Sequence, residues 1–315
     1  MDIEFKSFQP SLYALENFYA RIPQSHPQKN YIFTQLNNIR AGLKGELRVL
    51  QFIEEFAFPK ETLIIHNYQS RVHSKWSIQI DFLILTKKGI LIIEVKNIAG
   101  HIKFQRNPPQ IIRTLPDGTE NGMDCPFVQM ERNSKAIQQI LQNYSSVNTQ
   151  TCLVWANRKA RLSIEGIPKP HSFIPVKSLQ FYFESYFKQH DIFSNESFKM
   201  LQGQLLAKNK VPTKSLCQQY QVAEKDLLKG MFCNKCFQSL RKQRRTWDCP
   251  ICVIDANDQA EKNLMCQFSL VSSPLRIGVL QENLQHLSRK QIRLILQKNS
   301  VKSKGIKRGV LYSLE

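Results

Sequence analysis

Long hydrophobic runs and acidic residues are both scarce in this 315-residue sequence. Apolar runs such as Phe82–Leu85 and Ile90–Ile93 span four residues, far short of the roughly 20 that a membrane-spanning helix needs. The first ten residues, MDIEFKSFQP, lack the apolar core of a secretory signal. Eight cysteines in a chain of this length do not form a disulfide framework. We therefore expect a soluble, cytoplasmic protein.

The shortage of acidic residues leaves a strong positive charge. Lys and Arg number 44 against 25 Asp and Glu, a formal net charge of +19. Residues 226–315 hold 16 of the basic and 7 of the acidic residues, so no single tail carries the excess. Such a charge favours a polyanionic partner, either nucleic acid or an anionic membrane surface. No basic amphipathic segment supports the membrane surface, so nucleic acid is the expected partner.

The hydrophobic pattern predicts an α/β protein. Residues 31–58 follow the helical period, whereas residues 62–65, 78–85 and 89–95 have the composition of strands. The near-continuous apolar runs FLIL and ILII are typical of strands that are covered on both faces. Further helices are expected over residues 126–144, 176–188 and 195–208, with a strand over 151–156 and a polar connector over 209–230.

Asp81, Glu94 and Lys96 are the most informative residues of the first half. Alternate residues of a strand share a face, so Glu94 and Lys96 should point to the same side. If the strands on either side of Lys87-Lys88 pair as an antiparallel hairpin, Asp81 lies opposite Glu94. Two carboxylates so placed suit Mg²⁺ or Mn²⁺, and Lys96 could orient or help deprotonate an attacking water. The alternative is that these charges are simply solvated at strand ends.

The same residues resemble a known family. The blocks Gly42–Glu46, Gln79–Ile84 and Ile93–Asn97, with Gly100, resemble the nuclease-related domain (NERD), which belongs to the PD-(D/E)xK, restriction-endonuclease-like superfamily. The resemblance is strong over residues 35–145. Ile80 stands where the superfamily name has proline, a position that is commonly relaxed.

The resemblance implies a restriction-endonuclease-like mixed sheet flanked by helices. It also implies that Asp81 and Glu94 ligate the metal and that Lys96 serves the water. Two further residues would complete the site, one on the first helix and one on a later helix. The implied catalytic set is therefore Glu46, Asp81, Glu94, Lys96 and Gln129.

Four cysteines form a C-x₂-C-x₁₂-C-x₂-C pattern, which is typical of a zinc ribbon with a structural Zn²⁺. They are Cys233, Cys236, Cys249 and Cys252. Between the pairs lie four cations and an indole, which form either a phosphate-contacting and base-stacking surface or a solvated loop: Arg241, Lys242, Arg244, Arg245 and Trp247. The remaining cysteines are expected to be buried apolar residues: Cys125, Cys152, Cys217 and Cys266.

The last 46 residues, from 270, resemble a winged helix-turn-helix. A helix over 275–287 precedes Ser288, which is a favourable N-cap for a basic helix over 289–297. A basic, glycine-containing loop and a strand over 310–314 follow. The second helix would enter the major groove and the loop would follow the backbone. The expected nucleic-acid contacts are Arg289, Lys290, Arg293, Lys304, Lys307 and Arg308, and a protein-docking tail is the alternative.

Together these observations predict four segments. Residues 1–190 form a NERD-like domain, 191–230 a helical connector, 231–256 a zinc ribbon and 270–315 a winged-helix-like unit. The expected function is hydrolysis of DNA phosphodiester bonds with Mg²⁺ or Mn²⁺, and the C-terminal half grips the nucleic acid. The alternative from another class is a non-catalytic DNA-binding or scaffold protein. RNA as the substrate is a weaker option.

Overall fold

The computed structural model describes residues 2–5, 8–142, 147–164, 171–210, 214–244, 246–306 and 309–314, with the backbone alone for residues 2–5, 8–11 and 256. The chain divides into two compact units. The first unit comprises Met1–Lys6 and Ala41–Pro212, and the second comprises Ser7–Arg40 and Thr213–Glu315. This division does not coincide with the four segments expected from the sequence, because residues 7–40 pack with the C-terminal part of the chain.

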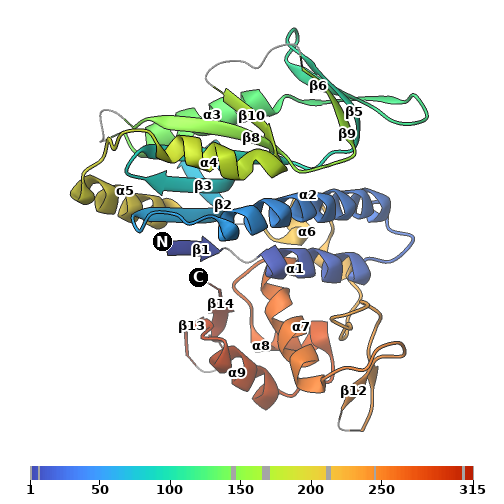
Figure 1. Ribbon diagram of the computed structural model, residues 1–315. Helices are drawn as coiled ribbons and strands as arrows, with labels where there is room; N and C mark the ends of the chain where they lie inside the picture. Colours follow the sequence, from blue (N-terminus) through green and yellow to red (C-terminus); the bar gives the residue numbers. More distant parts are fainter. Residues whose placement is uncertain are drawn as a thin grey trace. The chain divides into compact units, whose positions relative to one another are not determined.

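A six-stranded mixed sheet forms the centre of the first unit (Figure 1). The strands lie in the order β1 (Asp2–Phe5), β2 (Thr62–His73), β3 (Trp76–Thr86), β4 (Gly89–Lys96), β8 (Thr149–Trp155) and β10 (His171–Pro175). Strands β2, β3 and β4 are antiparallel neighbours. Strand β1 runs parallel to β2, and β8 runs parallel to both β4 and β10. The predicted mixed sheet is confirmed.

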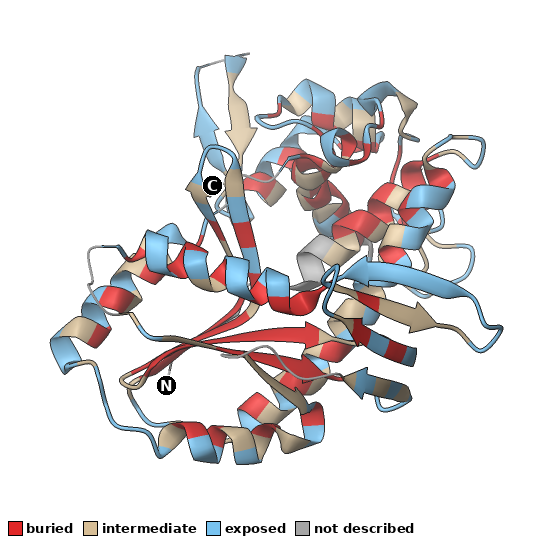
Figure 2. Cartoon of the chain, turned by 90° about the horizontal axis from the view of Figure 1, so that it is seen from above, coloured by how far each residue is buried: buried red, intermediate tan, exposed pale blue. Residues whose placement is uncertain are grey.

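Helices cover both faces of this sheet. The part of α2 (Lys29–Glu55) from Ala41 onward packs on one face together with α4 (Leu179–Phe187). Helices α3 (Pro126–Ile140) and α5 (Asn195–Lys208) pack on the other. Strand β4 is buried at every residue except Lys96, and the strands of the sheet are largely buried in Figure 2. The FLIL and ILII runs therefore belong to strands covered on both faces, as predicted.

A second, four-stranded sheet adjoins the end of α3. Its strands lie in the order β7 (Glu120–Asp124), β6 (Gln110–Thr114), β5 (Gly100–Gln105) and β9 (Ala160–Ile164). Ile102, Phe104 and Ile111 of this sheet form one buried cluster with Phe127 of α3 and Trp155 of β8. The N-terminal turn of α3 is thereby fixed against both sheets. Pro126 is its first residue, as the sequence predicted.

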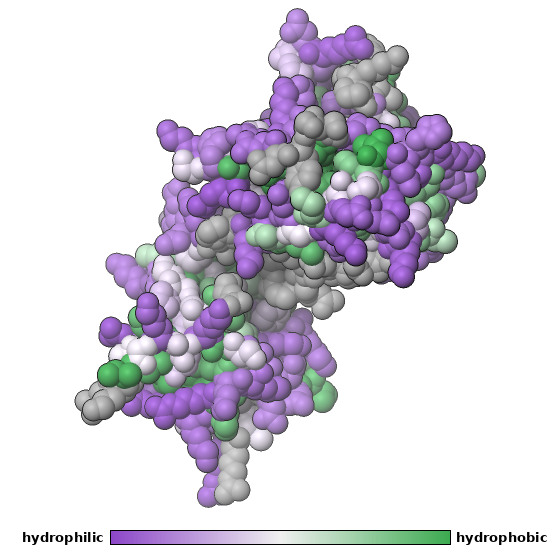
Figure 3. Space-filling view, turned by 90° about the vertical axis from the view of Figure 1, so that its left-hand side faces the viewer, coloured by the Kyte–Doolittle hydropathy of each residue, from purple (hydrophilic) through white to green (hydrophobic). Residues whose placement is uncertain are grey.

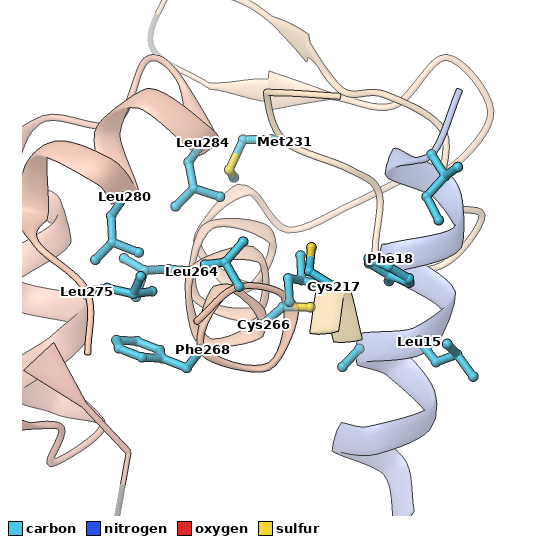
Figure 4. Close-up of a cluster of buried hydrophobic side chains, with 14 of the residues drawn as sticks. Leu15, Phe18, Cys217, Met231, Leu264, Cys266, Phe268, Leu275, Leu280 and Leu284 are labelled. Carbon is cyan, nitrogen blue, oxygen red and sulfur yellow. The ribbon is translucent and has the colours of Figure 1, made fainter. Parts of the chain in front are cut away.

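Helices around a single buried cluster form the second unit. They are α1 (Phe8–Arg21), the first part of α2, α6 (Leu216–Tyr220), α7 (Ala256–Leu270), α8 (Ile277–Leu284) and α9 (Arg289–Lys298). Figure 4 shows Leu264 and Cys266 of α7 between Phe18 of α1 and Leu280 of α8. The same cluster includes Cys233 of the cysteine pattern. The cysteine segment and the C-terminal residues thus share one core.

Helix α7 lies at the middle of this unit, yet the sequence did not predict it. Its buried face carries the polar residues Gln259, Asn263 and Gln267, which hide the helical period of apolar residues. Asn263 is satisfied internally: its Oδ1 accepts the Phe232 N–H at 2.9 Å and an Arg21 N–H at 3.2 Å. Burial lowers the pKa of Arg21 to about 10. The cation is retained at neutral pH and ties α1 to α7.

Two short hairpins complete the second unit. Strands β11 (Arg241–Lys242) and β12 (Trp247–Asp248) pair between the two cysteine pairs, and β13 (Lys302–Lys304) pairs with β14 (Leu311–Ser313). Ser288 caps α9 as predicted, and its hydroxyl accepts the Gln291 N–H at 3.2 Å. Among the described residues, none of the helices combines the length and the apolar character needed to cross a bilayer.

Candidate active site and cysteine cluster

The β3–β4 hairpin sets the register of the candidate site. Its paired residues run from Thr86 and Gly89, on either side of Lys87-Lys88, to Phe82 and Ile93. This is the predicted register. Asp81 and Glu94 are the next residues along it, one step beyond the last pair, so the site begins where the ladder ends.

Asp81 takes the place of a ladder partner. In an unbroken register Val95 would oppose Ile80, but the Val95 N–H is donated to Asp81 Oδ2 at 2.7 Å. Ile78 and Ile80 enter the same core cluster as Leu83 and Leu85. Because successive residues of a regular strand alternate between faces, this shared cluster means that the alternation reverses across Asp81.

The neighbouring strand has a matching irregularity. Asn67 of β2 falls between the pairs His66–Phe82 and Tyr68–Ile80, so it stands level with Asp81. Its φ of 54° lies in the left-handed region, which asparagine tolerates better than most residues. The left-handed residue on β2 and the reversal on β3 occur at the same level. Together they take Asp81 out of the regular strand pairing.

Glu94, Lys96 and Gln129 form a closed hydrogen-bonded triangle. The Lys96 ammonium donates to Glu94 Oε1 at 2.6 Å and to Gln129 Oε1 at 3.2 Å. The Gln129 amide donates to Glu94 Oε2 at 3.0 Å. Glu94 is 2% exposed. The triangle joins the end of β4 to the first turn of α3.

The pKa of Lys96 favours the ammonium form. Burial lowers the pKa of Lys96, but the attraction of Glu94, with smaller contributions from Asp81 and Glu46, outweighs it and raises the pKa above its ordinary value. Lys96 is therefore a cation at neutral pH and donates hydrogen bonds. The acidic groups respond in the opposite sense to burial, which raises the pKa of Glu94 despite the lowering effect of Lys96.

Glu46 is carried to the site by a close approach of α2 to the end of β4. A Cβ on Gly45 would lie 2.6 Å from Asn97 Cβ, so only glycine fits at this contact. Asn97 is held on two sides: its Nδ2 donates to the Ala41 carbonyl at 2.7 Å, and its Oδ1 accepts from Arg48 at 3.2 Å. The Gly45-Glu46 pair therefore has a physical basis, because Gly45 lets the helix approach and Glu46 follows it.

His66 orients the Glu46 carboxylate. His66 Nε2 lies 3.2 Å from Glu46 Oε2, and the imidazole stacks on the Phe82 ring with centroids 4.6 Å apart. His66 is 3% exposed. His66 lies one residue beyond the strand predicted over residues 62–65, so it was not among the predicted site residues. A strand extended by one residue would have placed an imidazole next to the acidic site.

The acidic groups of the site repel one another. Burial raises the pKa of Asp81 well above its ordinary value, and the charges of Glu94 and then Glu46 raise it further against the opposing effects of the Val95 N–H and Lys96. A divalent cation would offset this repulsion, and carboxylate oxygens are the donors that Mg²⁺ and Mn²⁺ prefer. The donor set therefore fits such an ion.

The four pattern cysteines lie close together, as the sequence predicted. In the described part of the chain they are the one group of three or more His, Cys, Asp or Glu whose ligand atoms all lie within 4.8 Å. The carboxylates of Glu46, Asp81 and Glu94 do not form such a group. A hard cation at Asp81 and Glu94 would therefore need waters to complete its shell, which is usual for Mg²⁺.

The geometry of the cysteine cluster fits a tetrahedral metal. The Sγ atoms of Cys236 and Cys249 are 3.4 Å apart, close to the edge of about 3.8 Å that Zn–S bonds of about 2.3 Å imply. Burial raises the pKa of Cys249, but N–H groups of Ile251 and Cys252 outweigh it and lower the pKa to about 7. The Ile251 N–H lies 3.4 Å from Cys249 Sγ. The other four cysteines are buried, as expected.

One part of the expected nucleic-acid surface is corrected. Trp247 is 8% exposed and belongs to the core of the second unit, so its indole is not available for base stacking. The Lys242 ammonium lies 4.7 Å from the centre of that ring. The expected cations that the structure describes are exposed: Arg241, Lys242, Arg244, Arg289, Lys290, Arg293 and Lys304. Arg245, Lys307 and Arg308 lie outside the described residues.

One segment of the chain matches a known family model. Residues 41–156 match the family model of the nuclease-related domain (NERD). The matched segment contains Glu46, His66, Asp81, Glu94, Lys96 and Gln129. No curated protein and no solved structure gave a significant match.

Proposed function

We propose that the protein is a metal-dependent nuclease that hydrolyses DNA phosphodiester bonds. The observation that carries this proposal is the convergence of Asp81, Glu94 and Lys96 at the end of the β3–β4 ladder. The match to the nuclease-related domain over residues 41–156 supports a nuclease-related function for this site. The fold is consistent with a restriction-endonuclease-like arrangement, with helices on both faces of a mixed sheet.

Each residue of the site has a role that follows from its contacts. Asp81 and Glu94 would hold Mg²⁺ or Mn²⁺, with Glu46 as an additional acidic residue. When bound, the ion supplies a Lewis acid that offsets negative charge on the phosphoryl group. Lys96 is an ammonium, so it would orient the attacking water and stabilise developing negative charge rather than act as the base. Gln129 keeps Lys96 and Glu94 in place.

The second unit would grip the nucleic acid. Its four-cysteine cluster would bind a structural Zn²⁺, as in a zinc ribbon, and its C-terminal helices and hairpin would act as a winged-helix-like reader. The exposed cations on these segments support phosphate contacts. Figure 3 shows mainly hydrophilic residues on the face that it draws, with small separate apolar areas, which suits a charged ligand.

Cleavage assays with site variants test the proposal. Wild-type protein should cut single- or double-stranded DNA with Mg²⁺ or Mn²⁺ and lose this activity in EDTA. Lys96→Met and Asp81→Asn should each lower the rate by about 10²-fold or more while DNA binding persists. The exposed control Lys103→Met should leave the rate unchanged. If the wild-type protein binds DNA but cuts neither the single-stranded nor the double-stranded form with either metal, the nuclease proposal is refuted.

One observation favours a second candidate, a DNA-binding or scaffold protein that does not turn over. Both carboxylate oxygens of Glu94 already accept hydrogen bonds, from Lys96 and from Gln129. A site satisfied internally in this way can persist as a docking element. The two candidates differ in their response to metal. Only the nuclease requires Mg²⁺ or Mn²⁺ to bind at Asp81. For the nuclease, the metal should therefore raise the Tm of the wild type more than the Tm of Asp81→Asn.

A further inference from the structure

A pocket of about 440 Å³ borders the candidate active site. Its lining includes Gln129, which contacts both Lys96 and Glu94, and Gln79, which precedes Asp81 by two residues on β3. Asp124 at the end of β7 and Arg132 on α3 line the same pocket. The pocket and the acidic site therefore adjoin at Gln129, which belongs to both.

The pocket is fixed by hydrogen bonds before any ligand enters. Asn133 lines it and is 3% exposed. The Asn133 amide donates to the Gln79 carbonyl at 3.1 Å, which joins α3 to β3 across the pocket. Gln129 is held by the Lys96 and Glu94 bonds described above. A pocket with such fixed walls can distinguish ligands by shape and hydrogen bonding.

The chemistry of the lining matches a nucleobase. Gln79 and Gln129 are exposed and each offers an amide, with a donor and an acceptor side by side, which is the pattern that base edges present. The Arg132 guanidinium can donate hydrogen bonds to a phosphate. The volume lies in the range of about 300–1,000 Å³ that small-ligand pockets occupy.

We propose that this pocket receives one unpaired nucleobase of the substrate, next to the scissile phosphate. The proposal rests on the proposed nuclease function and deepens it by naming the strand form. A base within a duplex must be unstacked and unpaired before it can enter a pocket, at a cost of a few kcal/mol that single strands largely avoid. The preferred substrate is therefore a single strand or an unpaired region rather than an intact duplex.

Single-stranded oligonucleotides with one abasic site test the proposal. The abasic site is moved one nucleotide at a time past the cleavage position, and the rates with Mn²⁺ are compared. We expect cleavage to fall about tenfold or more when the abasic site occupies one position, because a base held by a bidentate side-chain amide gains about 1–3 kcal/mol. Abasic sites elsewhere should change the rate less than threefold.

Variants connect the effect to this pocket. Gln79→Ala and Val128→Trp change residues of the lining that lie on the surface, so the fold should persist. Both should slow cleavage of the intact strand about tenfold and leave cleavage of the strand with the critical abasic site unchanged. Gln139→Ala is the matched control, because Gln139 is exposed on α3 and does not line the pocket.

Binding measured in Ca²⁺ separates this proposal from the nuclease function. A single strand with bases should bind more tightly than a strand of abasic sugars, and Gln79→Ala should remove that difference. Binding of this kind without any cleavage would support the pocket and refute the nuclease. Cleavage with equal rates at every abasic position, or with an intact duplex preferred to the single strand, would support the nuclease and overturn the pocket.

Discussion

The contact between α2 and the end of β4 provides the sharpest test of how the candidate site is built. The perturbation is Gly45→Ala, with Gly42→Ala as its control on the same helix. The new Cβ at Gly45 would lie 2.6 Å from Asn97 Cβ and 3.5 Å from Ala156 Cβ, whereas a Cβ at Gly42 meets nothing within 4 Å. Carbon atoms in contact normally lie about 3.5–4.0 Å apart. The helix must therefore move by about 1 Å at Gly45 and not at all at Gly42.

The structure also shows why Asn97 cannot yield. Its side chain donates to the Ala41 carbonyl and accepts from Arg48, so moving it breaks one of these bonds. Overpacking of this kind costs about 1–3 kcal/mol. Replacing a helical glycine by alanine returns about 0.5–1 kcal/mol, and both variants share this gain. Gly42→Ala should thus be more stable than the wild type, and Gly45→Ala should be about 1–3 kcal/mol less stable than Gly42→Ala.

Two assays check this reasoning. Thermal unfolding should place the Tm of Gly45→Ala roughly 2–12 °C below that of Gly42→Ala, at about 2–4 °C per kcal/mol. If the protein cuts DNA as proposed, Gly45→Ala should lower the rate by about 10²-fold, because Glu46 is displaced by about 1 Å. Equal Tm values for the two variants would refute the steric reasoning. A lowered Tm with full activity would show that Glu46 is not needed at this position.

Three further outcomes and one pH effect are expected. Metal analysis should find about one zinc ion per chain, lost together with much of the stability in Cys233→Ser; an unchanged zinc content would contradict the assignment. The double variant Arg289→Ala, Lys290→Ala should weaken DNA binding and lower the slope of log K against log salt concentration by up to about 2, measured by anisotropy; an unchanged slope would place the DNA elsewhere. His66→Ala should lower cleavage about tenfold at an unchanged Kd for DNA, since the carboxylate that it orients becomes free to rotate; a change in Kd alone would point to a different role. In EDTA, the wild type should lose stability as pH rises from about 4 through the raised pKa of Asp81, because a group with a raised folded pKa stabilises the fold only while protonated. Asp81→Asn should show a smaller loss in urea unfolding at several pH values, because the raised pKa of Glu94 remains, and parallel curves for the two proteins would refute the contribution of Asp81.

The sequence predicted the β3–β4 hairpin because two nearly continuous apolar runs are separated by a short polar turn. Such a pattern leaves few possible registers, and it placed Asp81 beside Glu94 without any knowledge of the rest of the sheet. Helix α9 was predictable for a similar reason, since Ser288 is a strong cap at its start. Local signals of this kind do not depend on contacts with distant parts of the chain.

Other features depend on contacts between residues that are far apart in the chain. The polar buried face of α7 becomes stable only when Asn263 meets Phe232 and Arg21. The local sequence around Asn263 does not indicate those partners. The same holds for the packing of residues 7–40 with the C-terminal part of the chain, which the order of the segments does not indicate.

The candidate site lies between these two cases, because its residues break the local rules. Asp81 interrupts an apolar strand, and Asn67 adopts a left-handed conformation at the same level on β2. Both features cost stability, as does the repulsion between Asp81, Glu94 and Glu46. An apolar residue at position 81 would pair in the ladder and remove most of that cost. Irregularities of strand, backbone and charge that meet at one point are expected where a function requires them, and here they meet at the carboxylates that would hold the metal.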